Sequence, residues 1–411
     1  MNASKKMLDN KIYMKLSNNL YNSFIKINNN SVISDQFIHN YIYDLNNILI
    51  FEFIKDNSFK SLFDYKNSES LIFELKNIKT IFNDIKYKYG NSILNSRSVE
   101  IQNKYFFDYL LSVVIPICLY LEKLRIDLNY KPVILGIQAH QGCGKTTLCD
   151  MISYYLSTYK NINAVTVSSD DYYLKYNDQI LLTKKNNMFK YRGPPGTHEV
   201  NLLYDLIDKV KNKKSNYYLT KYDKSLNKGA GDRIENTSEN YINKPIDILI
   251  FEGWFNGIKS VNRSVLQNNL INNYNKEIYN TESNKSLLDF QEVVSEYLKN
   301  DYESMWDNFD TMLILKPEKY EYSKFWRIEA ERIKGGMNLT KINEFVEYFW
   351  NSIPPNIYFD NLLKNSYSFK SNNILNNINN NAYKIDNNVI NCNKPFILNC
   401  DINRDFYIQK F

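Results

Sequence analysis

The chain has 411 residues, of which 44% are hydrophobic, 15% aromatic and 23% charged, so it can bury a sizeable core and is not a disordered protein. Its five cysteines are unevenly spaced, which excludes a disulfide scaffold and fits a reducing compartment. The net charge of +6 is weak evidence for a nucleic-acid partner, because only eight of the 51 basic residues are arginine and no basic stripe is present. We therefore expect no nucleic-acid partner.

The first hundred residues are predicted to form a helical extension. Residues 1–100 hold one of the twelve glycines and place apolar residues at helical spacing, as at Leu20, Phe24 and Ile27. The start of the chain lacks the apolar core of a signal peptide, so a cytoplasmic location is the expectation.

Residues 101–128 are predicted to form one long helix. The apolar stretch 106–121 within it is interrupted by Asp108 and Pro116, and it falls short of the roughly 20 apolar residues that cross a bilayer. It is therefore interpreted as a buried helix, and no membrane partner is expected.

A phosphate-binding loop is the strongest signal in the sequence. The apolar run 133–137 predicts a buried strand, followed by Ala-His-Gln-Gly-Cys-Gly-Lys-Thr-Thr at 139–147 and then a helical pattern. This is the P-loop arrangement, whose backbone N–H groups cradle the phosphates of a nucleoside triphosphate. Ala139 stands where the pattern has its first glycine. The candidate nucleotide-binding residues are Gln141, Gly142, Cys143, Gly144, Lys145, Thr146 and Thr147.

Within such a loop the lysine reaches the β- and γ-phosphates, and the hydroxyl of the next residue binds Mg²⁺. Lys145 and Thr146 occupy these two positions. The loop alone predicts a nucleoside triphosphate and does not separate a kinase from an ATPase or a GTPase.

Two acids follow the next predicted strand, residues 164–167. Asp170 and Asp171 stand directly after it, where a carboxylate can accept a proton from a substrate hydroxyl or orient Mg²⁺. The alternative interpretation is a cap for the following helix, and this segment alone does not decide between them.

A stiff loop at 191–199 reads Tyr-Arg-Gly-Pro-Pro-Gly-Thr-His-Glu. Proline and glycine rigidify such loops, and the guanidinium of Arg192 matches the geometry of a carboxylate or a phosphate. His198 is one of three histidines, and from the residues alone it is more often structural than catalytic.

A second polar loop, 221–233, offers Lys224 and Arg233 for an anionic substrate, with a solvated turn as the equally weighted alternative. The third predicted strand, 246–251, then ends in Glu252. An acid that closes an apolar strand is typical of a Walker-B segment, so Glu252 joins Thr146 as a candidate metal-site residue.

The last third of the chain supplies two more predicted strands, 312–315 and 396–398. Between them, Arg327 and Arg332 lie on a predicted helix, and Arg327 is a candidate for the arginine that a mobile lid brings to a transferring phosphate. Two asparagine-rich stretches, about 262–300 and 366–394, are predicted to be surface insertions.

Together the five strands, separated by helical patterns, predict an α/β protein. We expect a three-layer fold of the P-loop NTPase type, with a parallel sheet of about five strands and helices on both faces. This domain is expected to span residues 101–411 and to follow the helical extension 1–100.

Several segments resemble the D-glycerate 3-kinase family, which is similar to uridine kinase, phosphoribulokinase and bacterial pantothenate kinase. They occur in the family's order over about 130–405, and they leave out residues 1–100 and the asparagine-rich stretches. Glu199 replaces the family's aspartate after Thr-His, and His140 replaces a more usual proline. The resembling segments are 139–147, 169–174, 192–198, 222–225 with 231–233, 251–254, 326–327 and 396–404.

The resemblance implies a kinase that uses ATP and Mg²⁺ to phosphorylate a hydroxyl of a small acid, D-glycerate giving 3-phosphoglycerate. It implies that Asp170 accepts the hydroxyl proton, with Asp171 as the fallback, and that Arg327 closes from the lid. The substrate-binding residues that it implies are Arg192, Thr197, His198, Lys224 and Arg233.

Other functions remain open on the sequence. The phosphate machinery is shared with kinases of other small metabolites, such as a nucleoside, pantothenate or another sugar acid. A regulatory protein that binds ATP without transferring phosphate is a second alternative. The presence of Lys145, Asp170 and Glu252 together argues against it.

Overall fold

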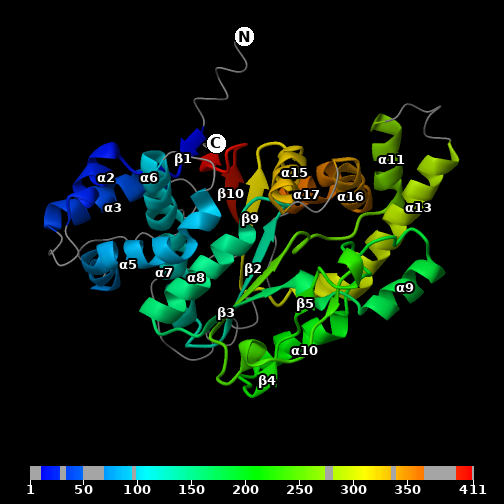
Figure 1. Ribbon diagram of the computed structural model, residues 1–411, viewed down its shortest axis with the longest axis horizontal. Coiled ribbons are helices and arrows are strands. Elements are labelled where there is room, and N and C mark those ends of the chain that lie inside the picture. Colours follow the sequence, from blue (N-terminus) through cyan, green and yellow to red (C-terminus); the bar gives the residue numbers. More distant parts are fainter. Residues whose placement is uncertain are drawn as a thin grey trace, which may run out of the picture.

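A seven-stranded sheet forms the centre of the computed structural model (Figure 1). The structure describes residues 11–27, 34–49, 69–94, 99–273, 281–334, 339–364 and 395–409. The strand order is β1-β11-β10-β9-β2-β8-β3, and the run from β10 to β3 is parallel. The strands are β1 (Lys11–Tyr13), β2 (Val133–Ala139), β3 (Ala164–Ser168), β8 (Ile248–Gly253), β9 (Thr311–Pro317), β10 (Phe396–Cys400) and β11 (Phe406–Gln409).

The parallel part of the sheet confirms the predicted α/β fold, because its five strands are the five apolar runs of the sequence. The two antiparallel strands, β11 and β1, lie beyond that prediction. They have four and three residues, too few for a period-of-two pattern to distinguish them from a loop.

Helices and two small antiparallel sheets complete the described fold. One sheet pairs β4 (Tyr217–Tyr218) with β7 (Tyr241–Ile242), and the other is a hairpin of β5 (Tyr222–Asp223) and β6 (Asp232–Arg233). The α-helices are α2 (Asn18–Ile25), α3 (Asp35–Leu49), α5 (Glu69–Leu94), α6 (Val99–Tyr109), α7 (Ile115–Asp127), α8 (Lys145–Tyr159), α9 (Tyr176–Lys185), α10 (Val200–Lys211), α11 (Arg263–Asn273), α13 (Glu282–Tyr297), α14 (Glu303–Trp306), α15 (Tyr322–Lys334), α16 (Leu339–Ser352) and α17 (Pro355–Lys364).

Two hydrophobic cores lie on opposite faces of the sheet. In β2, Val133, Leu135 and Ile137 belong to one core and Ile134 to the other, as expected when successive side chains point to opposite faces. The first core includes residues of α7 and α8, and the second includes residues of α10, α13, α16 and α17. The sheet is therefore covered on both faces, which explains why its strands are continuously apolar rather than alternating.

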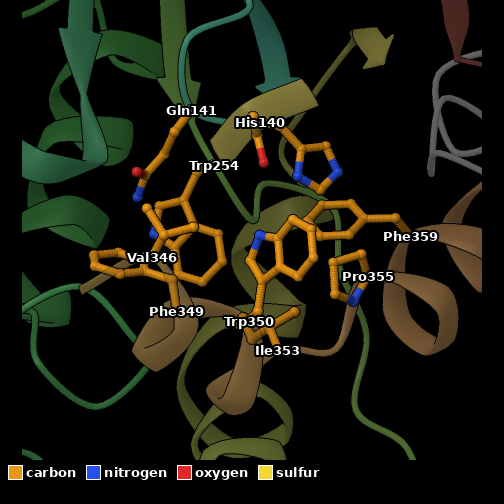
Figure 2. Close-up of a pocket in the computed structure, with 10 residues that line it drawn as sticks. His140, Gln141, Trp254, Val346, Phe349, Trp350, Ile353, Pro355 and Phe359 are labelled. Carbon is orange, nitrogen blue, oxygen red and sulfur yellow. The ribbon is translucent and has the colours of Figure 1, made fainter. Parts of the chain in front are cut away.

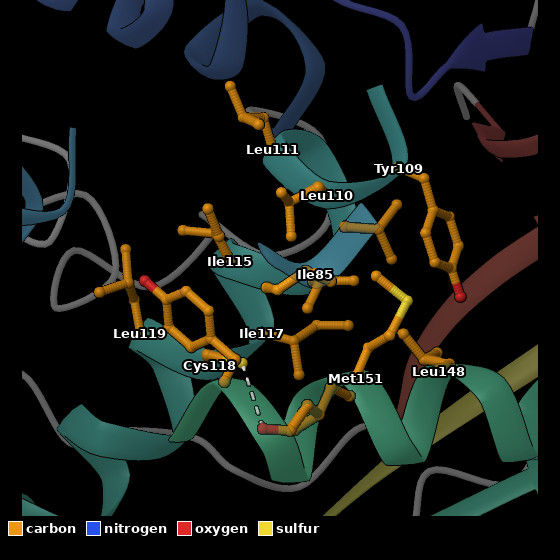
Figure 3. Close-up of a cluster of buried hydrophobic side chains, with 14 of the residues drawn as sticks. Ile85, Tyr109, Leu110, Leu111, Ile115, Ile117, Cys118, Leu119, Leu148 and Met151 are labelled. Carbon is orange, nitrogen blue, oxygen red and sulfur yellow. Dashed lines mark hydrogen bonds between the residues drawn. The ribbon is translucent and has the colours of Figure 1, made fainter. Parts of the chain in front are cut away.

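The N-terminal helices pack directly on the first core. Figure 3 shows Ile85 of α5 close to Met151 and Leu148 of α8, the helix that follows the phosphate loop. At the sheet edge, β1 pairs with β11, with Ile12 opposite Ile408. The division into an extension and a separate domain stays a prediction, because one continuous core holds residues of both.

The predicted long helix is present as α6, a π-helical turn at Leu110–Val114, and α7. Pro116 has no N–H to donate within the helix, and the wider turn accommodates it. The helix Gln102–Asp127 is long and apolar enough to cross a membrane, but 83% of its most apolar window is buried inside the fold. It is a core helix, as the sequence predicts.

One of the two predicted insertions differs from expectation. Residues 262–300 contain α11 and α13, and their side chains Leu266 and Val294 are fully buried in the second core. Apolar residues at helical spacing outweigh the asparagine content there. The other stretch, 366–394, lies outside the described residues.

Candidate active site

The phosphate loop joins the central strand to α8, as the sequence predicts. β2 ends at Ala139 and α8 begins at Lys145. Gly142 and Gly144 have φ angles of 82° and 83°, in the left-handed region that favours glycine. A Cβ on Gly144 would meet no atom within 4 Å, so the loop is open there. An open loop at a helix N-terminus is the geometry of an anion site.

Gly142, the other glycine of the loop, is in contact with two C-terminal elements of the chain. A Cβ on Gly142 would lie 2.4 Å from the Cβ of Trp326 in α15. The Gly142 carbonyl accepts a hydrogen bond of 2.9 Å from the Arg404 Nε, and the Arg404 guanidinium lies over the Trp326 ring. The Trp326 indole in turn donates to the carbonyl of Ile402, at 2.9 Å. The loop is therefore clamped by α15 and by the turn between β10 and β11.

Glu252 joins the candidate nucleotide and metal residues. It is the penultimate residue of β8 and is 3% exposed. The Lys145 Nζ lies 3.3 Å from its Oε2, and the Thr146 hydroxyl donates to its Oε1 at 3.2 Å. Burial alone would lower the pKa of Lys145, but the Glu252 carboxylate and then Asp170 raise it, so the ammonium is charged.

The oxygens of Thr146 and Glu252 fit a magnesium ion, which prefers hard oxygen ligands. No group of three or more His, Cys, Asp or Glu side chains able to hold a metal occurs within the described residues. Magnesium at this position would therefore take its other ligands from phosphate oxygens and water.

Asp170 lies in a short 3₁₀ turn, Ser169–Tyr172, directly after β3. Its Oδ1 accepts a hydrogen bond of 2.8 Å from the Tyr173 hydroxyl, and its Oδ2 accepts one of 2.6 Å from Lys224. Burial by itself would raise the pKa of Asp170, but Lys224 and Lys145, with the Tyr173 hydrogen bond, hold it well below its usual range. Both oxygens of this carboxylate are engaged.

The adjacent acid has a different environment. Asp171 accepts a hydrogen bond of 2.7 Å from Lys221, next to β5. Burial raises the pKa of Asp171, and the opposing effect of Lys221 is smaller. The two acids are therefore not equivalent: Asp170 faces Lys145 and the phosphate loop, whereas Asp171 ties the 3₁₀ turn to the β5–β6 hairpin.

Tyr173 organises the basic side chains around Asp170. Its ring centroid lies 4.6 Å from that of His198 and 5.4 Å from that of Tyr222. The Arg192 guanidinium is 5.9 Å from the same ring, and the Arg233 Nε donates to the Tyr173 carbonyl at 3.1 Å. The two polar loops predicted from the sequence therefore meet at this tyrosine.

His198 is held by Tyr302. Its Nδ1 lies 3.0 Å from the Tyr302 hydroxyl, which also accepts a hydrogen bond of 3.1 Å from the Gly196 N–H. Burial lowers the pKa of His198 to about 4, so the ring is neutral. Its buried Nε2 has no hydrogen-bond partner within the described chain.

The guanidinium groups of the two candidate arginines are both anchored to main-chain carbonyls. Arg192 donates to the carbonyl of Gly229 at 2.9 Å, which links the first polar loop to the second. Arg233 also lies 3.4 Å from the carboxylate of Glu199. Glu199, the residue that departs from the family pattern, therefore contacts a candidate substrate-binding arginine.

Two other predicted site residues have different surroundings. Thr197 is fully buried, and its hydroxyl donates to the carbonyl of Pro194 at 2.8 Å while accepting from the Gly193 N–H at 3.0 Å. Its hydroxyl therefore holds the loop in shape, and its role in substrate binding stays a prediction. The Arg327 guanidinium in α15 lies 5.2 Å from the Phe345 ring centroid. The side chain of Arg332 lies outside the described residues.

An apolar pocket borders the phosphate loop (Figure 2). His140 and Gln141 line it from the loop, and burial lowers the pKa of His140 to about 3, so this ring is neutral. The pocket has no charged lining and does not suit a polyphosphate or a carboxylate. The remaining lining residues are Trp254, Ser323, Val346, Phe349, Trp350, Ile353, Pro355 and Phe359.

The fold brings most candidate residues to one edge of the sheet, where β2, β8 and β3 are neighbours and end together. Tyr173, Tyr302 and Arg404 are site residues that the sequence-based candidates leave out. Tyr173 and Arg404 lie in segments that carry the family resemblance, and this resemblance is the sequence signal that could indicate them. Tyr302 lies in the π-helical turn Leu298–Tyr302 after α13, and nothing in its sequence neighbourhood indicates that it contacts His198.

Comparison with known proteins agrees with this geometry. No protein-family model matches the chain. Over 245 residues it is 29% identical to the chloroplastic D-glycerate 3-kinase of Arabidopsis thaliana, covering 57% of this chain and about half (49%) of that protein. It is 30% identical to the uncharacterized kinase mug58 of Schizosaccharomyces pombe, covering 57% of this chain and 83% of that protein.

A solved structure shares the fold. The D-glycerate 3-kinase of Cryptococcus neoformans aligns with a TM-score of 0.58 and 23% identity, covering 72% of this chain and 99% of that one. The three-layer P-loop fold is therefore confirmed. Together, the sequence relatives, the fold and the clustered motifs show that the chain belongs to the D-glycerate 3-kinase family of P-loop kinases.

Proposed function

We propose that the chain is an ATP-dependent kinase that transfers the γ-phosphoryl group to a hydroxyl of a small acid, D-glycerate giving 3-phosphoglycerate. One observation carries the proposal: the phosphate loop with its Lys145–Glu252 pair shares a sheet edge with Asp170 and the basic side chains around it. The name of the Arabidopsis relative supports D-glycerate as the acceptor.

The nucleotide is proposed to bind at the phosphate loop. The backbone N–H groups of residues 141–147 and the N-terminus of α8 hold the polyphosphate, and the ammonium of Lys145 moves from Glu252 to the β- and γ-phosphates. Mg²⁺, when bound at Thr146 and Glu252, neutralises phosphate charge.

Asp170 is the proposed general base. The acceptor oxygen bonds to the γ-phosphorus while the bond from that phosphorus to the β–γ bridging oxygen breaks. The hydroxyl proton goes to the Asp170 carboxylate, and ADP leaves. We assign Asp171, the fallback base, a positioning role instead, because its contact with Lys221 fixes the neighbouring hairpin.

The acceptor's carboxylate is proposed to bind between residues 191–199 and 221–233, here named the acceptor loops. Arg192, Lys224 and Arg233 supply positive charge, and the neutral His198 ring offers its buried Nε2 as a polar contact. Thr197 keeps the first loop in shape. Arg327 is proposed to approach the transferring phosphate when α15 closes.

A direct test measures ADP release with Mg-ATP and a panel of acceptors: D-glycerate, pantothenate, uridine and other sugar acids. Detection of the product by ³¹P NMR or mass spectrometry identifies the phosphorylated hydroxyl. Lys145→Ala is expected to abolish product formation, because the phosphates lose their charged ligand.

Each result separates the candidates. Turnover of another compound without turnover of D-glycerate would make the chain a kinase of a different metabolite. Tight ATP binding without transfer to any acceptor, unchanged by Asp170→Asn, would instead indicate a regulatory ATP-binding protein.

The compartment stays a prediction. The four cysteines of the described chain are free and buried, in agreement with a reducing environment. The name of the Arabidopsis relative places that protein in the chloroplast. For the present chain we propose a cytoplasmic location with ATP and a hydroxy acid as its small-molecule partners.

A further inference from the structure

In the structure without substrate, both oxygens of Asp170 accept a hydrogen bond from the protein. Tyr173 donates to one carboxylate oxygen and Lys224 to the other, at 2.8 and 2.6 Å. The Lys224 ammonium also pairs ionically with that second oxygen, which makes the oxygen a weaker base for as long as the pair persists. Asp170 becomes a stronger base for the acceptor hydroxyl when this ammonium leaves.

Lys224 is the donor that can leave. Its side chain is 56% exposed, and the Asp170 carboxylate is its one ionic partner within the described chain. Tyr173, by contrast, is buried and packed between His198 and Tyr222. The Asp170 side chain is only 23% exposed, but the lysine end of the pair faces solvent, so the ammonium can turn to another anion without disturbing buried groups.

The backbone around Lys224 does not depend on its contact with Asp170. The Asp223 carboxylate accepts hydrogen bonds from the Ser225 N–H and hydroxyl, at 2.7 and 2.6 Å, and β5 pairs with β6. The hairpin keeps its shape when the ammonium moves. The charged ends of Arg192 and Arg233, in contrast, are anchored by main-chain carbonyls.

We propose that Lys224 caps Asp170 in the absence of an acceptor, and that the carboxylate of an arriving hydroxy acid draws the ammonium away and exposes the base. This inference rests on the proposed function and deepens it. According to this inference, the anionic group of the acceptor has two roles: it binds the acceptor to the protein, and it frees Asp170 from Lys224.

The electrostatics agree with this device. Lys224 lowers the pKa of Asp170 against the raising effect of burial. Once the ammonium turns to the acceptor's carboxylate, the base becomes more basic while it faces the hydroxyl. A neutral alcohol of the same shape has no charge with which to draw Lys224 away.

The cap also protects ATP. With the cap in place, Asp170 is a weak base for water near the γ-phosphate. With the cap removed, Asp170 can take a proton from water while the water oxygen bonds to the γ-phosphorus, and ADP and inorganic phosphate leave. The cap therefore couples nucleotide use to the presence of an acidic acceptor.

The test compares Lys224→Gln with the unaltered full chain in Mg-ATP. ADP release without any acceptor is expected to rise about tenfold, a modest part of what a general base contributes. The ratio of kcat/KM for D-glycerate to that for glycerol, its uncharged analogue, is expected to fall at least about tenfold, because only the charged acceptor uses the lysine.

Two further variants serve as controls. Lys209→Gln removes a lysine that pairs with Asp205 within α10, outside both acceptor loops, and is expected to leave acceptor-free ADP release unchanged. Lys224→Arg keeps the positive charge and is expected to keep ADP release low. An increase that occurs in Lys224→Gln alone is specific to the cap.

The proposal is overturned if Lys224→Gln leaves acceptor-free ADP release at the unaltered level, or if it lowers turnover of D-glycerate and glycerol by equal factors. It is also overturned if Lys224→Arg releases ADP as fast as Lys224→Gln. Failure of the proposed function gives a distinct result: D-glycerate is not phosphorylated, yet acceptor-free ADP release still rises in Lys224→Gln.

Discussion

The two halves of the site are built in different ways. The nucleotide half, from β2 through α8, is shaped by backbone: a buried strand, two glycines with positive φ and a helix N-terminus. The acceptor half is shaped by side chains from separate segments, with Tyr173 contacting Asp170 and lying between the rings of His198 and Tyr222.

This difference explains which parts of the site can be predicted from the amino-acid sequence. A backbone site leaves its pattern in consecutive residues, since each position of the loop needs a particular residue type. A side-chain site depends on which distant segments meet. We therefore expect substitutions in the acceptor half to change turnover, whereas glycine substitutions in the nucleotide half change folding and ATP affinity.

The largest expected effect is on the base. Asp170→Asn should lower kcat with D-glycerate by about 10²–10⁴-fold, because an amide cannot take the hydroxyl proton. Steady-state kinetics with ATP and acceptor varied separately measures it, and the KM for ATP should change little. Asp171→Asn is the matched control. A larger loss in Asp171→Asn than in Asp170→Asn would exchange the roles of the two acids.

The nucleotide half should respond to glycine substitution through stability. Gly142→Ala combines a left-handed φ with a Cβ that would lie 2.4 Å from the Trp326 Cβ, so it should cost about 3 kcal/mol of unfolding free energy. Gly144→Ala has a similar φ but open space around it, and should cost about 1 kcal/mol. Urea denaturation of both variants measures the difference.

Equal losses in these two variants would show that the contact with Trp326 relaxes without cost. ATP binding provides a second readout, because a Cβ at Gly144 would enter the space where a phosphate is expected. Gly144→Ala should therefore weaken ATP binding by more than its stability change alone suggests.

The same contrast governs how far the sequence predicts the molecule. The five parallel strands and the phosphate loop follow from apolar runs and from Gly142, Gly144 and Lys145. The edge strands β1 and β11 cannot be predicted from apolar runs, because they are short and their pairing joins distant parts of the chain. The asparagine content of residues 262–300 favours a surface insertion, yet the helical spacing of Leu266 and its neighbours decides the structure there.

In the site, Asp170, Lys224 and Arg233 could be named as candidates from residue type and motif. Their arrangement could not, because ion pairs between segments 54 residues apart leave no local pattern. Tyr302 is the clearest case, since its contact with His198 spans 104 residues of chain.

A smaller effect is expected at Tyr173. Tyr173→Phe removes the hydrogen bond that orients the Asp170 carboxylate and should lower kcat about tenfold. A hydrogen bond to a charged group is worth roughly 1.5–3 kcal/mol, and part of that free energy would be lost from the positioning of the base. That bond helps to hold the pKa of Asp170 down, so its loss raises this pKa. The acid limb of the kcat/KM profile should therefore move to higher pH, because the base is protonated at a pH where it was ionised before.

Tyr222→Phe is the matched control, because the Tyr222 hydroxyl donates to the carbonyl of Ala230 at 3.2 Å and makes no bond to Asp170. The acid limb of the kcat/KM profile of Tyr222→Phe should stay at the same pH as in the unaltered chain. If both variants move the limb equally, the shift reflects general loosening of the acceptor loops and not the bond to Asp170.

The smallest expected effect concerns Arg404, whose long side chain clamps the phosphate loop. Its guanidinium donates to the Gly142 carbonyl and pairs with Glu329 of α15 at 2.8 Å, so one group ties the loop to α15. Arg404→Lys keeps the positive charge but loses the planar guanidinium, which donates to the carbonyl and to the carboxylate at the same time. It should raise the KM for ATP about threefold with kcat unchanged. Lys15→Gln, which removes the ion pair to Asp405 on the same turn, is the control. If Arg404→Lys instead lowers kcat, the arginine contributes to the transfer step itself, and the nucleotide half then depends on side-chain placement as the acceptor half does.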